Sequence, residues 1–120
     1  MTIEQLNQSR PLGDVFFAYD RVDLDATATA TLDRNATWLR RWTSTTIRIE
    51  GHADERGTAE YNLALSSRRA TAVRNYLTSL GIPENRVTVV GLGKEQPVCS
   101  AATASCWQQN RRGSPLIVTK

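Results

Sequence analysis

Short stretches in which apolar and polar residues alternate, or in which β-forming residues cluster, predict the strands of this chain. Residues 46–50 alternate isoleucine with charged residues, which is typical of a strand with one face buried on a sheet. Residues 14–19 are rich in β-forming side chains and end in a polar turn, and residues 87–90 and 116–118 are short branched apolar runs. The sequence therefore predicts four strands.

Apolar residues recur at helical spacing in two longer stretches. Asp25 suits the N-cap of a helix that runs to about residue 42. Residues 59–80 form the clearest element, and Gly81 is placed to end it. The apolar face predicted for this second helix consists of Leu65, Ala72, Val73, Tyr76, Leu77 and Leu80.

The order of these elements predicts an α+β domain. We expect a two-layer βαβαββ arrangement, with a mixed four-stranded sheet and the helices packed on one face. Residues 1–13 are polar with Pro11 and Gly13 and are interpreted as a lead-in, and residues 14–120 as one domain. Residues 91–109 are predicted to form a long loop.

Composition excludes several classes of protein. The chain is 40% hydrophobic and 22% charged, and no apolar run approaches the ~20 residues that span a bilayer. The net charge of +3 comes with acids interspersed among the bases, so the sequence does not favour a nucleic-acid partner. The N-terminus lacks the features of a signal peptide. We therefore expect either an intracellular protein or a fragment of a longer one.

Cys99 and Cys106 are the two cysteines, and they lie in the predicted loop. With a single histidine in the chain, a zinc site lacks ligands. A disulfide that closes a short loop in an oxidising compartment and two buried reduced thiols both fit the spacing. The residues favour a disulfide between Cys99 and Cys106, with two reduced thiols as the alternative.

Arg69 interrupts the apolar stripe of the second helix, and Asp54 lies in the loop before that helix. A buried guanidinium needs a partner. An internal ion pair of Arg69 with Asp54 or Glu60 and a two-pronged contact with a ligand carboxylate are equally compatible with the pattern. If Asp54 and Arg69 face one cleft, they would bind an ammonium and a carboxylate, which together make the zwitterionic end of an amino acid.

Catalytic interpretations have less support. His52, Asp54 and Glu55 resemble a fragment of a metal site, but no second imidazole accompanies them. No serine or cysteine nucleophile lies in a recognisable setting, and no general acid is paired with a base. We expect a protein without enzymatic activity, cofactor or metal.

The stretch IEGHADERGTAEYNLALSSRRATAVRNYL closely resembles the signature of OmpA-like peptidoglycan-binding domains. The blocks VFFAYDRVDL, GKEQPV and NRR resemble three further motifs of that family, so the resemblance extends from about Asp14 to Arg112. It is nearest to the peptidoglycan-associated lipoprotein branch of Gram-negative envelopes. PVCSAATASCWQQNRR resembles a version found in alphaproteobacterial members.

The resemblance implies non-covalent binding of peptidoglycan through the meso-diaminopimelate of its stem peptide. By position, Asp54 matches the aspartate that meets the ligand ammonium, and Arg69 the arginine that meets its carboxylate. His52 is expected to support the loop and Arg68 to lie on the surface. The other positions that match the family's binding site are Phe17, Ala18, Tyr19, Asp20, Thr58, Asn62, Leu65, Asn110 and Arg111.

The resemblance also implies a partner and a location. The lipoprotein branch pairs with the TolB propeller protein, and a lipid on an N-terminal cysteine anchors it to the periplasmic side of the outer membrane. This chain has no such cysteine, so we expect a soluble fragment that would reach the membrane only through an anchor outside it. A wall-binding domain of a porin or flagellar stator protein, and a protein–protein adaptor of the envelope, are the alternatives.

One segment departs from the family pattern. Gly113, Ser114 and Pro115 stand between the last motif and the final apolar run. Because proline cannot donate a hydrogen bond to a sheet, we expect the last strand to be displaced, shortened or at an edge.

Overall fold

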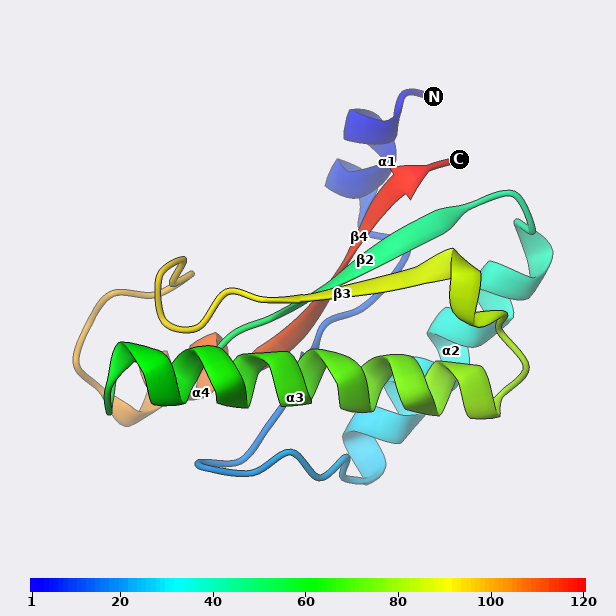
Figure 1. Ribbon diagram of the computed structural model, residues 1–120. Helices are drawn as coiled ribbons and strands as arrows, with labels where there is room; N and C mark the ends of the chain where they lie inside the picture. Colours follow the sequence, from blue (N-terminus) through cyan, green and yellow to red (C-terminus); the bar gives the residue numbers. More distant parts are fainter.

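One four-stranded sheet, in the order β1-β4-β2-β3, organises the computed structural model, which describes residues 1–120 (Figure 1). Strands β2 and β3 run parallel, whereas β4 runs antiparallel to both β1 and β2. The sheet is thus mixed, and the predicted α+β class is confirmed. The elements in chain order are α1 (Ile3–Ser9), β1 (Val15–Phe16), α2 (Ala26–Arg41), β2 (Thr46–Gly51), α3 (Ala59–Ser79), the 3-10 turn η1 (Glu84–Arg86), β3 (Val87–Gly91), α4 (Ala104–Asn110) and β4 (Arg112–Thr119).

Helices α2 and α3 share one core with the sheet. Ile47 and Ile49 of β2 and Ile117 of β4 point to the same side and join buried residues of both helices in a single apolar cluster. Asp25 caps α2 by accepting a hydrogen bond from the Ala28 amide at 2.8 Å, as the sequence predicts. The core therefore lies between the two helices and one face of the sheet.

Glycines allow α3 to lie unusually close to the sheet. A Cβ atom on Gly51 would lie 1.8 Å from the backbone oxygen of Ser66, and one on Gly91 would lie 2.1 Å from the Ser67 hydroxyl. Helix α3 ends where predicted, and Gly81 follows with a φ of +95°. This close contact fixes the start of α3 against the carboxyl ends of β2 and β3.

Two short helices and a shorter first strand differ from the prediction. The lead-in contains α1, and the predicted 91–109 loop contains the start of α4. Helix α1 has no buried residue, so it carries no apolar period that a sequence pattern could reveal. The first strand was predicted over 14–19 but pairs only at Val15 and Phe16.

Strand β4 corrects the expectation drawn from Pro115. It spans eight residues and lies inside the sheet, so it is neither shortened nor displaced. Backbone groups alternate in direction along a strand, and those of Ile117 point away from β2, where both bond to the side chain of Asn7. Pro115, two residues earlier, points the same way, beyond the end of β1. Its missing N–H therefore costs no strand-to-strand hydrogen bond.

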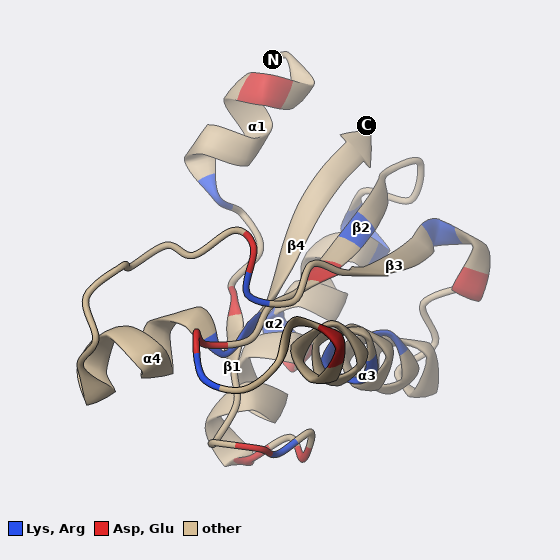
Figure 2. Cartoon of the chain, turned by 60° about the vertical axis from the view of Figure 1, so that its left-hand side comes forward, with Lys and Arg blue, Asp and Glu red and all other residues tan.

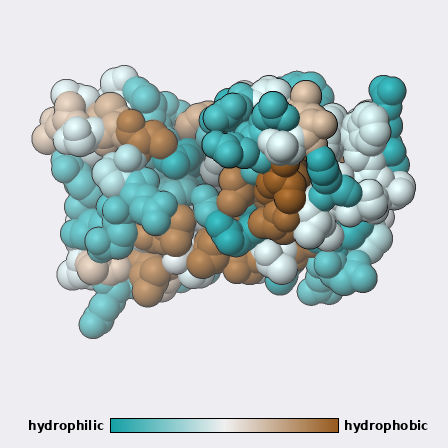
Figure 3. Space-filling model, turned by 90° about the horizontal axis from the view of Figure 1, so that it is seen from above, coloured by the Kyte–Doolittle hydropathy of each residue, from teal (hydrophilic) through white to brown (hydrophobic).

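The surface is mixed in character. Seen from above, it is mostly hydrophilic, with apolar side chains in several small groups (Figure 3). No helix combines the length and the apolar character that a membrane span requires.

Candidate functional site

A short loop joins the end of β2 to the start of α3 and carries the charged residues of the candidate site. Gly57 in this loop has a φ of +91°, a left-handed conformation that glycine adopts without strain. Asn62 of α3 donates to the Arg56 carbonyl at 2.7 Å, and the Thr58 hydroxyl caps the helix by accepting from the Tyr61 amide at 3.1 Å. These contacts fix the loop backbone. Figure 2 shows its acidic and basic residues side by side between α4 and the start of α3.

Asp54 is 4% exposed and accepts four hydrogen bonds. Its Oδ1 accepts from the backbone N and the Nε of Arg56 at 3.0 and 3.2 Å. Its Oδ2 accepts from Nη2 of Arg56 at 2.8 Å and from Nη1 of Arg111 at 3.4 Å. Burial raises the pKa of Asp54, but the bonds from Arg56 and Arg111 lower it by more than burial raises it. The pKa of Asp54 is therefore below its usual value. Asp54 is therefore an ionised acceptor at neutral pH.

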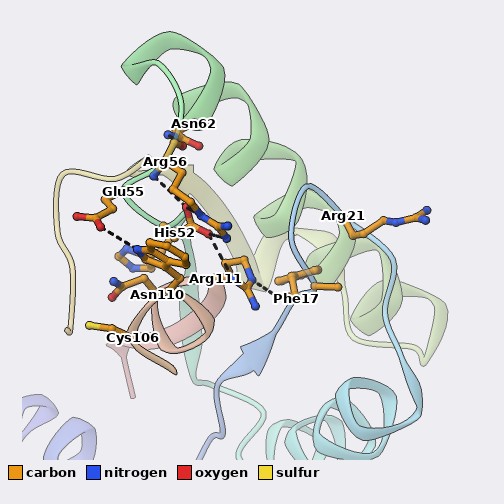
Figure 4. A network of polar contacts seen from close by, with 12 residues as sticks. Phe17, Arg21, His52, Glu55, Arg56, Asn62, Cys106, Asn110 and Arg111 are labelled. Atoms are coloured by element: carbon orange, nitrogen blue, oxygen red, sulfur yellow. Dashed lines mark hydrogen bonds and ion pairs between the residues drawn. The ribbon is translucent and has the colours of Figure 1, made fainter. Parts of the chain in front are cut away.

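Arg56 lies flat between two aromatic rings. Its guanidinium carbon is 4.0 Å from the ring centre of Tyr19 and 4.1 Å from that of Trp107. The indole N–H of Trp107 donates to Glu55 at 2.8 Å, which links α4 to the loop (Figure 4). The hydrogen bond from Arg56 to Asp54 raises the pKa of Arg56, so Arg56 and Asp54 are both charged at neutral pH.

Arg69 is completely buried and forms no ion pair. Its Nε, Nη1 and Nη2 donate to the backbone carbonyls of Arg21, His52 and Ala18 at 3.0, 3.0 and 3.2 Å. Burial lowers the pKa of Arg69 to about 10, which leaves it charged at neutral pH. Of the two alternatives for Arg69, the internal ion pair with Asp54 or Glu60 is wrong: backbone carbonyls accept from this guanidinium, and Asp54 is bound by Arg56 and Arg111 instead.

Arg111 joins the last motif to the first strand region. Its Nε donates to the Phe17 carbonyl at 2.8 Å, and its Nη1 contacts Asp54 (Figure 4). Its side chain is 13% exposed. The structure thus brings three arginines around one aspartate at the carboxyl end of β2.

A small pocket of about 40 Å³ opens beside this cluster. Six of the site residues predicted from sequence line it: Tyr19, Asp20, Asn62, Leu65, Asp54 and Arg69. The remaining lining residues, which the sequence analysis did not propose as site residues, are Ala53, Arg56, Gly57 and Tyr61. Arg56 could have been suspected from its position two residues after Asp54, whereas Trp107 comes from a distant segment and gave no such signal.

The other predicted site residues support the pocket from outside its lining. Phe17 is buried with its ring centre 5.3 Å from the guanidinium carbon of Arg69, and Ala18 offers Arg69 its carbonyl. Thr58 serves as the cap of α3. Arg68 is exposed, as expected.

Asn110 holds the loop before α4 instead of facing the pocket. Its Oδ1 accepts from the amides of Val98 and Cys99 at 2.8 and 3.2 Å, and its amide donates to the Cys99 carbonyl at 2.7 Å. The disulfide between Cys99 and Cys106 ties the same loop to α4. The disulfide is confirmed, and with Asn110 it positions the adjoining Trp107.

His52 is buried under the site rather than exposed on it. The backbone of His52 accepts from Arg69 and donates to the Arg112 carbonyl at 2.8 Å, while neither ring nitrogen has a hydrogen-bond partner. Burial, with the nearby charge of Arg112, lowers the pKa of His52 to about 4. No group of three or more histidine, cysteine or acidic side chains gathers in a way that could hold a metal ion.

Relatives of this chain in two different bacteria carry the same name, peptidoglycan-associated lipoprotein. It is 55% identical over 107 residues to the peptidoglycan-associated lipoprotein of Rhizobium meliloti, covering 88% of this chain and 61% of that protein. It is 42% identical over 103 residues to the peptidoglycan-associated lipoprotein of Pseudomonas aeruginosa, covering 86% of this chain and 61% of that protein. The chain thus spans about three fifths of the length of these relatives.

Solved structures agree with this likeness. The crystal structure of the peptidoglycan-associated lipoprotein from Burkholderia pseudomallei matches with a TM-score of 0.84 and 39% identity, over 88% of this chain and 89% of that one. The C-terminal domain of Helicobacter pylori MotB matches with a TM-score of 0.83 over 91% of this chain and 86% of that one, at 16% identity, which shows a shared fold alone. Residues 16–111 match the OmpA family, and with these relatives that match shows that the chain belongs to this family.

Proposed function

We propose that this domain binds peptidoglycan non-covalently, through the meso-diaminopimelate of the stem peptide, without a catalytic step. The observation that supports the proposal most is that a buried, ionised aspartate, Asp54, and a buried arginine, Arg69, line one small pocket at the carboxyl end of β2. The name of the relatives points to peptidoglycan. Loops at strand ends, held by a rigid sheet, are a common place for ligand contacts.

The charges of the pocket match the free end of meso-diaminopimelate, where one carbon carries an ammonium and a carboxylate. Asp54 would accept the ammonium. Arg69 has five N–H donors and uses three on backbone carbonyls, so two remain for the ligand carboxylate. Arg111 adds a second cation on the same side. Lysine at that stem position lacks the carboxylate and would leave these arginines without their counterion.

The remaining predicted positions would act around this contact. Tyr19, Asp20, Asn62 and Leu65 would form the walls of the bound state. Phe17, Ala18 and Thr58 would hold the surrounding backbone, and Asn110 would keep α4 in place. The bound ligand would thus be recognised by its charges and by the shape of a rigid rim.

In the cell, the domain would tether the outer membrane to the wall. The relatives are named as lipoproteins, so the tether would need a lipid anchor outside the 120 residues and would act on the periplasmic side of the outer membrane. TolB is the partner that we propose for the domain. A place in a porin or stator protein is favoured less, because the MotB likeness is limited to the fold.

Calorimetric titration tests the proposal. The tripeptide L-Ala-γ-D-Glu-meso-diaminopimelate is titrated into the wild-type chain, Asp54→Asn and Asp23→Asn, the last removing an exposed acid whose side chain is 79% accessible. We expect binding by wild type and Asp23→Asn, a loss in Asp54→Asn, and none for the lysine tripeptide. Equal binding of the lysine tripeptide would contradict the proposed recognition of the carboxylate. The absence of binding heat in wild type and in both variants would contradict wall binding.

A further inference from the structure

The carboxylate of Asp54 has no free acceptor position in this structure. A carboxylate offers about four lone-pair positions. Arg56 fills three of them and Arg111 the fourth. A ligand ammonium that is to bind Asp54 must therefore displace one of these donors.

The space beside Asp54 leads to the same conclusion. The pocket holds about 40 Å³, which is room for about three water molecules, since each needs ~10–15 Å³ of such space. A carbon that carries both an ammonium and a carboxylate is larger. Arg56 lines this pocket, and Arg69 behind it is fully buried. Entry of the zwitterionic group therefore requires a side chain to leave.

Arg56 is the donor that can leave. Its side chain is 33% exposed, whereas that of Arg111 is 13% exposed and is also held by the Phe17 carbonyl. Bonds from Asn62 and Lys94 fix the loop backbone at Arg56 and Gly57. A change of side-chain rotamer therefore removes the two guanidinium bonds to Asp54 without moving the loop, while the backbone N–H of Arg56 keeps its bond. The rings of Tyr19 and Trp107 hold the guanidinium only by its two faces.

We propose that Arg56 is a displaceable plug that occupies the cation position of the binding site in the free protein. The inference rests on the proposed function and adds to it the residue that limits affinity. The guanidinium stands where the ligand ammonium binds, so the free protein is competent only in the fraction of molecules with Arg56 turned away. The apparent affinity is reduced by that fraction.

Trp107 sets how firmly the plug is held. It covers one face of the Arg56 guanidinium, and α4 carries it next to Cys106, whose disulfide ties that helix to residue 99. Replacing Trp107 by leucine removes one stacking face and keeps every charge of the arginine cluster. This variant separates release of the plug from the simple loss of a positive charge near an ammonium ligand.

The test is calorimetric titration of L-Ala-γ-D-Glu-meso-diaminopimelate into wild type, Arg56→Met, Trp107→Leu, Arg68→Met and Asp54→Asn. The side chain of Arg68 is exposed and makes no hydrogen bond, and its loss removes one charge close to Arg69, which makes it the matched charge control. Stacking and ion-pair energies at such exposed sites predict that Arg56→Met binds the tripeptide at least about fivefold more tightly than Arg68→Met does. Trp107→Leu is predicted to bind it about two- to fivefold more tightly than wild type.

The outcomes separate the two proposals. Tighter binding than wild type by both Arg56→Met and Trp107→Leu supports the plug. A different result would overturn the plug and leave wall binding intact: wild type binds, Asp54→Asn does not, and Arg56→Met binds no more tightly than Arg68→Met. No heat from any variant overturns the proposed function, and the plug with it.

Discussion

Arg69 is expected to be a structural residue as well as a ligand contact, and Arg69→Met tests this. The substitution keeps an apolar side chain of similar length but leaves three backbone carbonyls, at residues 18, 21 and 52, without their donor. Each buried acceptor that loses its partner costs about 1–3 kcal/mol, and such costs on one residue do not simply add. We expect the free energy of unfolding to fall by about 3–6 kcal/mol.

The magnitude matters because a domain is stable by only about 5–15 kcal/mol. Urea unfolding followed by circular dichroism measures the loss. Arg68→Met, on the preceding and exposed residue, is the control and is expected to change stability by less than about 0.5 kcal/mol. If Arg69→Met lowers the free energy of unfolding by less than about 1 kcal/mol, the view that its guanidinium holds the backbone at residues 18–21 and at residue 52 would be refuted. If the loss is as large as expected, absent ligand binding in Arg69→Met reflects unfolding of the pocket as much as a missing contact.

Three further substitutions probe the fold. Gly51→Ala places a Cβ against the Ser66 carbonyl and should cost several kcal/mol in urea unfolding; an unchanged midpoint would contradict the close contact of α3 with β2. Asn7→Ala removes both bonds to Ile117, so we expect about 1–3 kcal/mol less stability and faster amide exchange at residue 117, whereas unchanged exchange would contradict that contact. His52, with a folded pKa of about 4, stays neutral while the unfolded chain takes up a proton below pH ~6.5, so stability should fall by about 2 kcal/mol from pH 7 to pH 5. His52→Phe should lessen that fall, and an equal fall in both proteins would refute the assignment.

The elements with a strong period were predictable from the sequence. Strand β2 alternates, and α3 combines a cap with a long apolar stripe and a terminal glycine, so both were predicted to within a residue or two. Helix α1 was not, because its amphipathic signal is absent and it is held by the Asn7 side chain on the backbone of β4. Local patterns cannot reveal such long-range bonds.

The candidate site was also predictable only where local sequence signals exist. Asp54 and Arg69 were singled out as candidate ligand contacts, because an acid at a strand end and a base in an apolar stripe are local signals, and both line one pocket. Their bonding partners were not predictable. Arg69 binds carbonyls from two distant loops, and Asp54 is bound by Arg111, which is 57 residues away. Trp107 reaches Arg56 only because the disulfide and Asn110 fold the preceding loop against α4.

The most direct test of the central claim is a map of backbone amide shifts during titration with L-Ala-γ-D-Glu-meso-diaminopimelate. Wall binding at this pocket predicts saturable shifts confined to residues 17–20, 52–58, 61–69 and 107–111, with the largest at Asp54 and Arg56. Shifts that cluster elsewhere, such as the apolar groove of Trp38, Trp42 and Leu6 between α1 and α2, or no shifts at all, would contradict the account.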